Sequence, residues 1–319
     1  MILKKSEPRL PPHDDGKRVW IKKIGRALKD WQLYVLLLPA VIYLFIFSYY
    51  PMYGAQIAFK DYSARLGIWG SEFVGLKWFK KFINFSNFDL LMENTLEIGL
   101  YVLATFPLSL IFALMLNELK NGKFKKIVQM ISYMPYFLST VVVCSMILLF
   151  TDEKNGILNK LIELFGGTSI PFMTEPFLFA DVYVWSGVWQ GLGWCAIIYL
   201  AALSNVPTEL VEAAKIDGAS RLQIIRHVMI PCILPTIIIQ LIFACGGILG
   251  VGHEKVLLLQ NDLNISRSQV ISTYVYQLGI RSGQFSYSAA IGLFNNLVSV
   301  SVLSIVNAIA KRTTEISIW

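Results

Sequence analysis

The chain has 319 residues, of which 55% are hydrophobic and only 15% are charged, whereas a soluble domain carries about a quarter charged residues. This composition argues against a soluble globular protein and indicates a membrane protein. The excess of 28 basic over 21 acidic residues does not indicate a nucleic-acid partner, because nine of the basic residues lie within residues 1–30, beside a long apolar run. We expect residues 1–30 to form a basic cytoplasmic tail.

Six stretches are long and apolar enough to cross a bilayer core, which needs about 20 helical residues. They are residues 31–50, 94–118, 127–150, 178–203, 233–252 and 287–310. The predicted fold class is therefore an all-α integral membrane protein, with six transmembrane helices in a domain of residues 31–319.

Lysine and arginine in the connecting segments predict the orientation of these helices. With a cytoplasmic N-terminus, the inside segments hold 18 basic residues in 76 positions and the outside segments hold 10 in 104. Because cytoplasmic loops carry an excess of basic residues, we expect both termini, and the connection between the fourth and fifth helices, to be cytoplasmic.

The segment GLKWFKKFINFSNF, residues 75–88, interleaves apolar residues with lysines between the first and second spans. This pattern is typical of a helix lying in a membrane interface. It is equally compatible with a short helix packed on the outer surface of the protein.

The connection 204–232 carries helix signals that an irregular loop would lack. Pro207 suits a first helical turn, and Glu209 and Glu212 place negative charge near the N-terminus of that helix. Asp217-Gly218 predicts a turn that ends it, because glycine takes left-handed backbone angles without a steric penalty. Ser220 and Gln223 then form a capping-box pattern that opens a second helix.

The result is a predicted helix-turn-helix outside the lipid. The small residues Ala213, Ala214 and Gly218 would allow a partner to approach closely, and the charges of Glu209, Glu212 and Lys215 could pair with that partner. A hairpin that packs only on its own bundle remains the alternative.

The spacing of this loop carries a family resemblance. Glu212-Ala213-Ala214, Gly218 six residues after the glutamate, and Val228-Met229-Ile230-Pro231 resemble the EAA loop of ATP-binding-cassette importer permeases, EAA-x3-G-x9-I-x-L-P, with conservative departures at Val228 and Ile230. The segment YYPMYGAQIAFKDYSARLGIWGSEFVGLKWF, residues 49–79, is similar to the permeases of the oligosaccharide and polysaccharide group, which is related to the maltose permeases.

The resemblance implies a multi-pass subunit of a bacterial plasma (cytoplasmic) membrane importer. Its partners would be a second homologous permease, an ATPase dimer that receives the EAA loop as a coupling helix, and an extracellular or periplasmic sugar-binding protein. The cargo would be an oligosaccharide, including pectin-type or alginate-type acidic ones. The implied coupling residues are Glu209, Glu212, Ala213, Ala214, Lys215, Asp217, Gly218 and Ala219.

The chain itself is not expected to be an enzyme or to hold a cofactor. It has no GxxxxGK[ST] phosphate-binding loop, and the match Gly191-Leu-Gly193-Trp-Cys-Ala196 lies inside a span without a preceding strand. ATP and magnesium would bind to the ATPase partners. The three histidines, at 13, 227 and 253, lie outside the spans and form no metal-ligand or catalytic pattern.

Aromatic rings and amides in the fourth span indicate a sugar pathway, since sugars present apolar C–H faces and hydroxyl edges. The resemblance places a maltose-lining W-x-G segment at Trp189-Gly191, and it places further lining positions in the fifth span. Independently of the resemblance, polar groups in the sixth span must face a partner helix or the pathway. The candidate pathway residues are Trp185, Trp189, Gln190, Gly191, Trp194, Ala244, Gly247, Ile248, Val251, Asn295, Asn296 and Ser299.

Two other functions remain open. An ATP-binding-cassette permease for amino acids or peptides would share the EAA loop, but the 49–79 segment argues against it. An ion-coupled secondary transporter would need a carboxylate or an unwound helix near the middle of the membrane, and none of the six spans has a central acidic residue.

Overall fold

A computed structural model of the protein describes residues 31–319, so the predicted tail of residues 1–30 lies outside the described residues. The chain divides into two compact units, Met1–Gln56 and Ile57–Trp319. In the first unit, α2 (Trp31–Leu44) continues through a π-helical segment (Phe45–Tyr49) into α3 (Tyr50–Met52). The first apolar helix, Trp31–Phe59, is long enough to cross a membrane, as predicted, and ends with the 3-10 turn Tyr53–Phe59.

The second unit begins with a small hairpin that the all-α prediction did not include. Strands β1 (Lys60–Asp61) and β2 (Glu72–Phe73) pair antiparallel, with Lys60 opposite Phe73 and Asp61 opposite Glu72, and α4 (Gly67–Gly70) lies between them. Helix α5 (Lys77–Ile83) follows and packs on the long C-terminal helix α18 (Phe285–Thr314). Its Phe82 is buried against Phe294, so this helix is packed on the protein, although Ile83 remains exposed.

The second predicted span consists of α6 (Phe88–Ala104) and α7 (Phe106–Glu118), which together form one apolar helix. The two parts meet at Thr105, whose backbone N–H donates to the carbonyls of Tyr101 and Val102. Pro107 follows at the start of α7 and supplies no backbone N–H. The helix therefore keeps its direction but changes its hydrogen bonding in the middle of the span.

The third span is the largest departure from the sequence prediction. A single helix over residues 127–150 was expected, but the structure has α8 (Gly122–Tyr133) with a 3-10 turn (Met134–Phe137), and then α9 (Thr140–Phe150) bent from it by 104°. Pro135 removes a helical donor, and Leu138 and Ser139 are extended. The Ser139 hydroxyl accepts from the backbone N–H of Val142 and so caps the new helix.

Helix α10 (Ile157–Leu164) and a 3-10 turn (Pro176–Leu178) lead into α11 (Phe179–Ser204), which forms the fourth span as predicted. This helix contacts α6, α7, α8 and α14 (Ile230–Gly246). Gly193 is buried, and a Cβ there would overlap the backbone carbonyl of Ser132. The glycine therefore lets α11 and α8 approach closely.

The fifth span also differs from its prediction. Two helices were expected outside the lipid before this span. The first is α12 (Thr208–Ile216). The second, α13 (Arg221–Ile224), instead continues through a π-helical segment (Ile225–Met229) into α14 (Ile230–Gly246). Together, α13 and α14 form one apolar helix, Arg221–Gly246. It stops short of the expected residue 252, because Gly247 to Gly250 fold into a turn closed by a 2.8 Å bond from the Gly250 N–H to the Gly247 carbonyl.

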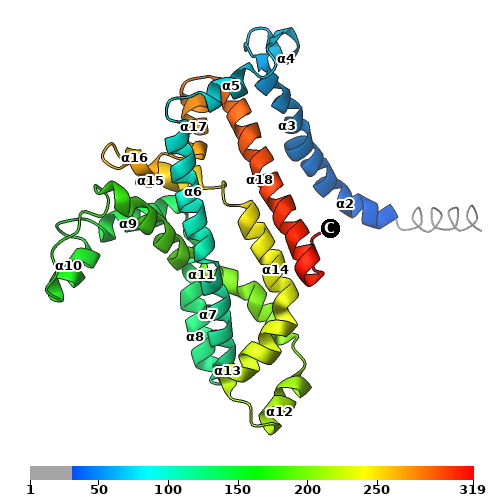
Figure 1. The fold of residues 1–319 in the computed structure, drawn as a ribbon, viewed down its shortest axis with the longest axis vertical. Coiled ribbons are helices and arrows are strands. Elements are labelled where there is room, and N and C mark those ends of the chain that lie inside the picture. The colour runs from blue at the N-terminus through cyan, green and yellow to red at the C-terminus, as the bar shows by residue number, and fades with distance from the viewer. Residues whose placement is uncertain (1–30) are drawn as a thin grey trace, which may run out of the picture. The chain divides into compact units, whose positions relative to one another are not determined.

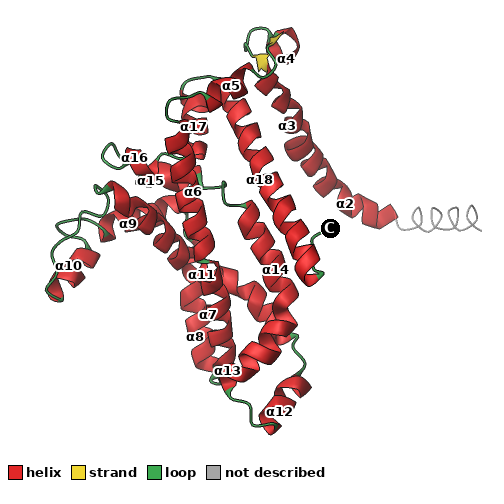
Figure 2. Ribbon diagram, viewed as in Figure 1, coloured by secondary structure: helices red, strands yellow, loops and turns green. Residues whose placement is uncertain are grey.

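The remaining helices are α15 (His253–Leu259), α16 (Ile265–Ser268), α17 (Ile271–Tyr276) with a π-helical segment (Gln277–Arg281), and α18 (Phe285–Thr314). Helix α18 is the sixth predicted span. It runs antiparallel to α14, because Leu303 lies beside Gly246 and the Asn295 amide donates to the Leu249 carbonyl. Within the unit Ile57–Trp319, α12 and α13 lie at one end, and α5 and α17 lie at the other (Figures 1 and 2).

Candidate functional site

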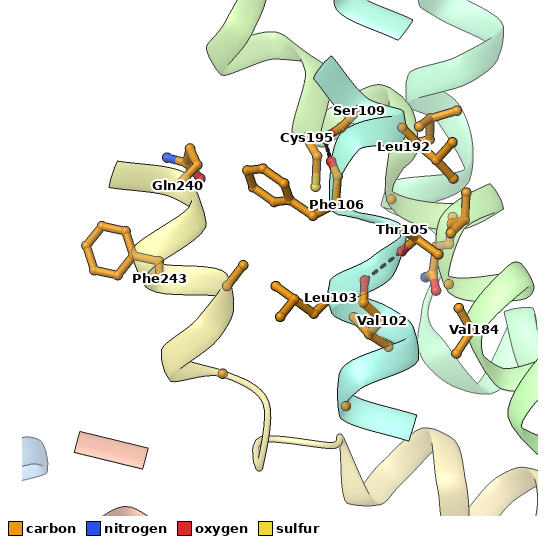
Figure 3. Close-up of a pocket in the computed structure, with 18 of the residues that line it drawn as sticks. Val102, Leu103, Thr105, Phe106, Ser109, Val184, Leu192, Cys195, Gln240 and Phe243 are labelled. Atoms are coloured by element: carbon orange, nitrogen blue, oxygen red, sulfur yellow. Dashed lines mark hydrogen bonds between the residues drawn. The ribbon is translucent and has the colours of Figure 1, made fainter. Parts of the chain in front are cut away.

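A pocket of about 730 Å³ lies among α6, α7, α11, α14 and the first residues of α15 (Figure 3). Val102, Thr105 and Phe106 line it from the junction of α6 and α7, and Gln240 and Phe243 line it from α14. Its walls are mostly apolar, with a few amide and hydroxyl groups among them. This combination is typical of a small-molecule or saccharide site.

One wall of the pocket is the Gly247–Gly250 turn, which rests directly on α6. A Cβ at Gly99 would overlap the Ile248 carbonyl, so only glycine at position 99 lets the turn lie this close. Gly247, Ile248 and Gly250 then face the pocket. The end of α14 is thereby fixed against the middle of the second span.

Seven of the predicted pathway residues line this pocket: Gln190, Gly191, Trp194, Ala244, Gly247, Ile248 and Val251. The Gln190 amide donates a long bond of 3.4 Å to the Leu138 carbonyl. The Trp194 ring stacks on Tyr136 with ring centroids 4.5 Å apart and planes 4° apart. One face of this indole is therefore already occupied within the protein.

Five predicted residues lie outside the lining: Trp185, Trp189, Asn295, Asn296 and Ser299. The Trp185 indole donates to the Tyr101 hydroxyl at 2.9 Å, and that hydroxyl donates to Asp181 at 2.7 Å. Trp189 is 45% exposed on another face of α11. Asn295 binds the Gly247–Gly250 turn through the Leu249 carbonyl.

Several lining residues were not singled out from the sequence. The signal at Thr105 and Phe106 was the following proline, which interrupts helical bonding in mid-span. Gln240 stood out as an amide within an apolar run, and such residues face a protein interior or a pathway. Tyr183 and Lys255 gave no comparable signal, because the approach of α15 to α11 depends on the tertiary fold.

Lys255 belongs to α15 but reaches α11. Its Nζ donates to the Tyr183 carbonyl at 2.9 Å and lies 4.8 Å from the centre of the Tyr183 ring. Burial lowers the pKa of Lys255 to about 8, because removal from water disfavours the charged form. A pKa of about 8 leaves the protonated form in the majority at pH 7.

The predicted coupling helix is α12, and hydrogen bonds define its C-terminal end and the start of α13. Gly218 has φ +80°. The Ala219 N–H donates to the Ala214 carbonyl, and the Gly218 N–H donates to the Lys215 carbonyl, which together form a Schellman motif. The Ser220–Gln223 capping box is also formed, with bonds of 2.7 Å and 3.4 Å, as the sequence predicted.

The predicted coupling residues divide by exposure. Glu209, Glu212, Ala213, Lys215, Asp217 and Gly218 are exposed, whereas Ala214 and Ala219 are half-buried. Ala214 and Ala219 pack on the apolar cluster around Tyr199 and Leu203 of this chain's own bundle. A hollow of about 320 Å³ beside Gly218 is lined in part by Asp217, Gln223 and His227. Among residues 31–319, no cluster of acidic, histidine or cysteine side chains could hold a metal.

Comparison with known families and proteins gives consistent matches. Residues 105–315 match the family described as binding-protein-dependent transport system inner membrane component. The chain is 42% identical over 299 residues to Protein LplB of Bacillus subtilis, covering 93% of each chain. It is 41% identical over 304 residues to the polygalacturonan/rhamnogalacturonan transport system permease protein YteP of the same organism, covering 95% of this chain and 94% of that one.

Solved structures agree with these matches. A bacterial transporter involved in the import of the acidic polysaccharide alginate has a chain with 36% identity and a TM-score of 0.82, covering 93% of this chain and 99% of that one. A bacterial alginate transporter in complex with an alginate pentasaccharide-bound periplasmic protein gives 35% identity and a TM-score of 0.83, with coverage of 94% and 100%.

Proposed function

The chain belongs to the family of binding-protein-dependent transport system inner membrane components, and from this membership we propose that it is the membrane-spanning permease subunit of an ATP-driven oligosaccharide importer. The observation that carries the proposal is the 41% identity to the YteP permease along 95% of this chain. The pocket among α6, α7, α11 and α14 gives such a subunit a place through which a sugar could pass.

The substrate class that we propose is an acidic oligosaccharide of the pectin or alginate type. Two independent matches support it, because YteP is named for polygalacturonan and rhamnogalacturonan and the similar solved transporter imports alginate. All three polymers contain uronic acids, which carry carboxylates at neutral pH.

The importer would contain further subunits. A periplasmic or extracellular binding protein would deliver the sugar, and the alginate transporter solved with its substrate-loaded periplasmic protein supports this partner. A second homologous permease would complete the pathway, and an ATPase dimer would bind ATP and magnesium. The hydrolysis step would belong to those ATPase subunits and not to this chain.

We propose that α12 couples the ATPase to the pathway. Its C-terminal Schellman motif and the capping box that follows support this role, because a helix fixed at its end transmits a displacement that a flexible loop would absorb. Glu212 would contact the ATPase through its exposed carboxylate, with Glu209, Ala213 and Lys215 on the surrounding exposed surface. Ala214 and Ala219 would attach the helix to its own bundle.

The proposed location is the bacterial plasma (inner) membrane, with both termini and α12 in the cytoplasm. The greater density of lysine and arginine in the segments on that side supports this orientation. The position of α12 and α13 at the end of the unit opposite α5 and α17 supports it as well.

A pull-down separates this proposal from an ion-coupled transporter. The detergent-solubilised protein, expressed with the ATPase of its own organism, should retain that ATPase through α12. A Glu212→Lys variant should retain less of it, whereas a Lys160→Glu variant on α10, at the other side of the proposed membrane, should behave as wild type. Failure of the wild-type protein to retain any ATPase would contradict the proposal, and would leave the secondary-transporter alternative.

The pocket residues predict a difference between neighbouring side chains of α11. Gln190→Ala should raise the apparent KM for oligosaccharide uptake several-fold, because Gln190 lines the pocket and its amide could bind a sugar hydroxyl. Trp189→Ala removes a larger side chain outside the lining, and it should change that KM less. Uptake kinetics in membrane vesicles measure both, and a larger effect at Trp189 would place the sugar outside this pocket.

A further inference from the structure

Among the described residues that line the pocket between α6, α7, α11 and α14, Lys255 is the one basic side chain, and none is acidic. Lys255 also forms no ion pair within residues 31–319, where the ion pairs are Lys77–Asp61 and Arg267 with Glu93 and Glu97. The pocket therefore contains a positive charge that the described part of the protein does not neutralise.

The local contacts of Lys255 stabilise the ammonium group only in part. Its Nζ donates one bond to the Tyr183 carbonyl and lies over the Tyr183 ring. An ammonium has three N–H donors, and these contacts use one of them together with the ring face. Burying a charge without a partner of opposite sign is unfavourable, so an anion entering the pocket would be attracted to this group.

The ammonium is accessible from the pocket because α11 has a glycine beside it. A Cβ on Gly187 would lie 3.4 Å from the Lys255 Nζ, and Gly187 itself lines the pocket. Any larger side chain at this position would extend over the ammonium. The lysine and the glycine together make an open cationic site in an otherwise apolar wall.

We propose that Lys255 binds a carboxylate of the sugar in the pocket and makes the permease itself select uronate-containing oligosaccharides over neutral ones. This inference rests on the proposed function as an oligosaccharide importer, and it assigns the selection for acidic sugars to one residue of the permease. A carboxylate fits the site because its charge is opposite to that of the ammonium and its oxygens accept hydrogen bonds from N–H donors that the Tyr183 carbonyl does not use. A neutral sugar would leave the charge unpaired.

The test uses the complete importer, with its ATPase, partner permease and binding protein, in proteoliposomes at pH 7. The probes are trigalacturonate and its fully methyl-esterified form, which has the same sugars without the charge. The quantity compared is the ratio of uptake kcat/KM for the acid to that for the ester. Every variant uses the same binding protein, so a change in this ratio between variants arises in the permease.

Lys255→Met should lower the acid-to-ester ratio about tenfold, which corresponds to about 1.4 kcal/mol, and Lys255→Arg should largely restore it. Gly187→Leu, which covers the ammonium but leaves it in place, should lower the ratio in the same direction. Lys160→Met is the matched control. It removes an exposed lysine of α10 that does not line the pocket, and should leave the acid-to-ester ratio unchanged.

Three results would overturn the inference. The first is a Lys255→Met protein that assembles and transports both probes with the wild-type ratio. The second is a fall in ratio that arginine does not reverse, since that would indicate a packing role for the lysine. The third is a wild-type importer that takes up the ester as well as the acid. Failure of the wild-type importer to take up either probe or any other oligosaccharide would instead overturn the proposed function, and this inference with it.

Discussion

Replacement of Gly218 with valine is expected to lower sugar uptake more than tenfold while ATP hydrolysis by the assembled importer continues. Gly218 has φ +80° with no neighbouring atom within 4 Å of a potential Cβ, so the change introduces backbone strain without a clash. A β-branched residue in this left-handed conformation costs about 1–2 kcal/mol. The C-terminal cap of α12 would loosen, and the helix would no longer transmit the movement of the ATPase.

Two controls separate coupling from folding in this experiment. Gly218→Asn should keep most of the uptake, because asparagine tolerates the left-handed conformation. Gly292→Ala changes a glycine of α18 that also has open space around it and lies outside the loop, and it should have little effect. Uptake and ATP hydrolysis by Gly218→Val at wild-type levels and in the wild-type ratio would contradict the role proposed for this turn.

Gly193→Ala is expected to destabilise the protein by about 1–3 kcal/mol, as overpacking of a close contact does. The added methyl group would overlap the backbone carbonyl of Ser132 and force α11 away from α8. The apparent melting temperature of the detergent-solubilised protein should fall by several degrees. Fluorescence-detected size-exclusion chromatography after heating measures this change.

Gly191→Ala is the matched control, because Gly191 lies two residues away on the same helix with no atom within 4 Å of a potential Cβ. Both changes improve helix propensity by about 1 kcal/mol, so the difference between them reports the contact with α8. Equal melting temperatures for the two variants would show that α11 and α8 do not pack this closely.

The helix-turn-helix connection between α11 and α14 could be predicted from the sequence because its signals are local. The Gly218 turn and the Ser220–Gln223 capping box depend on residues within six positions of each other, and the structure forms both. The continuation of α13 into α14 was not predicted. It depends on the burial of Ile224 and Met229 against the bundle, which is a tertiary contact.

The spans were predicted from length and hydropathy, which do not show whether the helix axis changes direction within a span. The apolar run 127–150 is long enough to cross a membrane, but it bends by 104° where Pro135 ends one helix and Ser139 caps the next. Both residues were visible in the sequence. Their effect was missed because hydropathy averages over a window and does not register a change in hydrogen bonding.

The pocket was only partly predictable for a similar reason. The sequence indicated α11 and the end of α14, where Gln190, Trp194 and Gly247 line the pocket. The sequence could not distinguish the faces of α11. Trp185 and Trp189, which lie outside the lining, were therefore grouped with Gln190 and Trp194, which belong to it. Lys255 was missed because its position in the pocket follows from the packing of α15 on the rest of the unit.

Uptake by the reconstituted importer tests the central claim most directly. Proteoliposomes containing this chain with its partner permease, ATPase and binding protein would enclose ATP, a non-hydrolysable ATP analogue, or no nucleotide with an imposed proton or sodium gradient. We expect an external uronate oligosaccharide to accumulate above its outside concentration only with ATP. Accumulation driven by an ion gradient without ATP, or ATP-dependent accumulation of amino acids or peptides in place of sugars, would contradict the account.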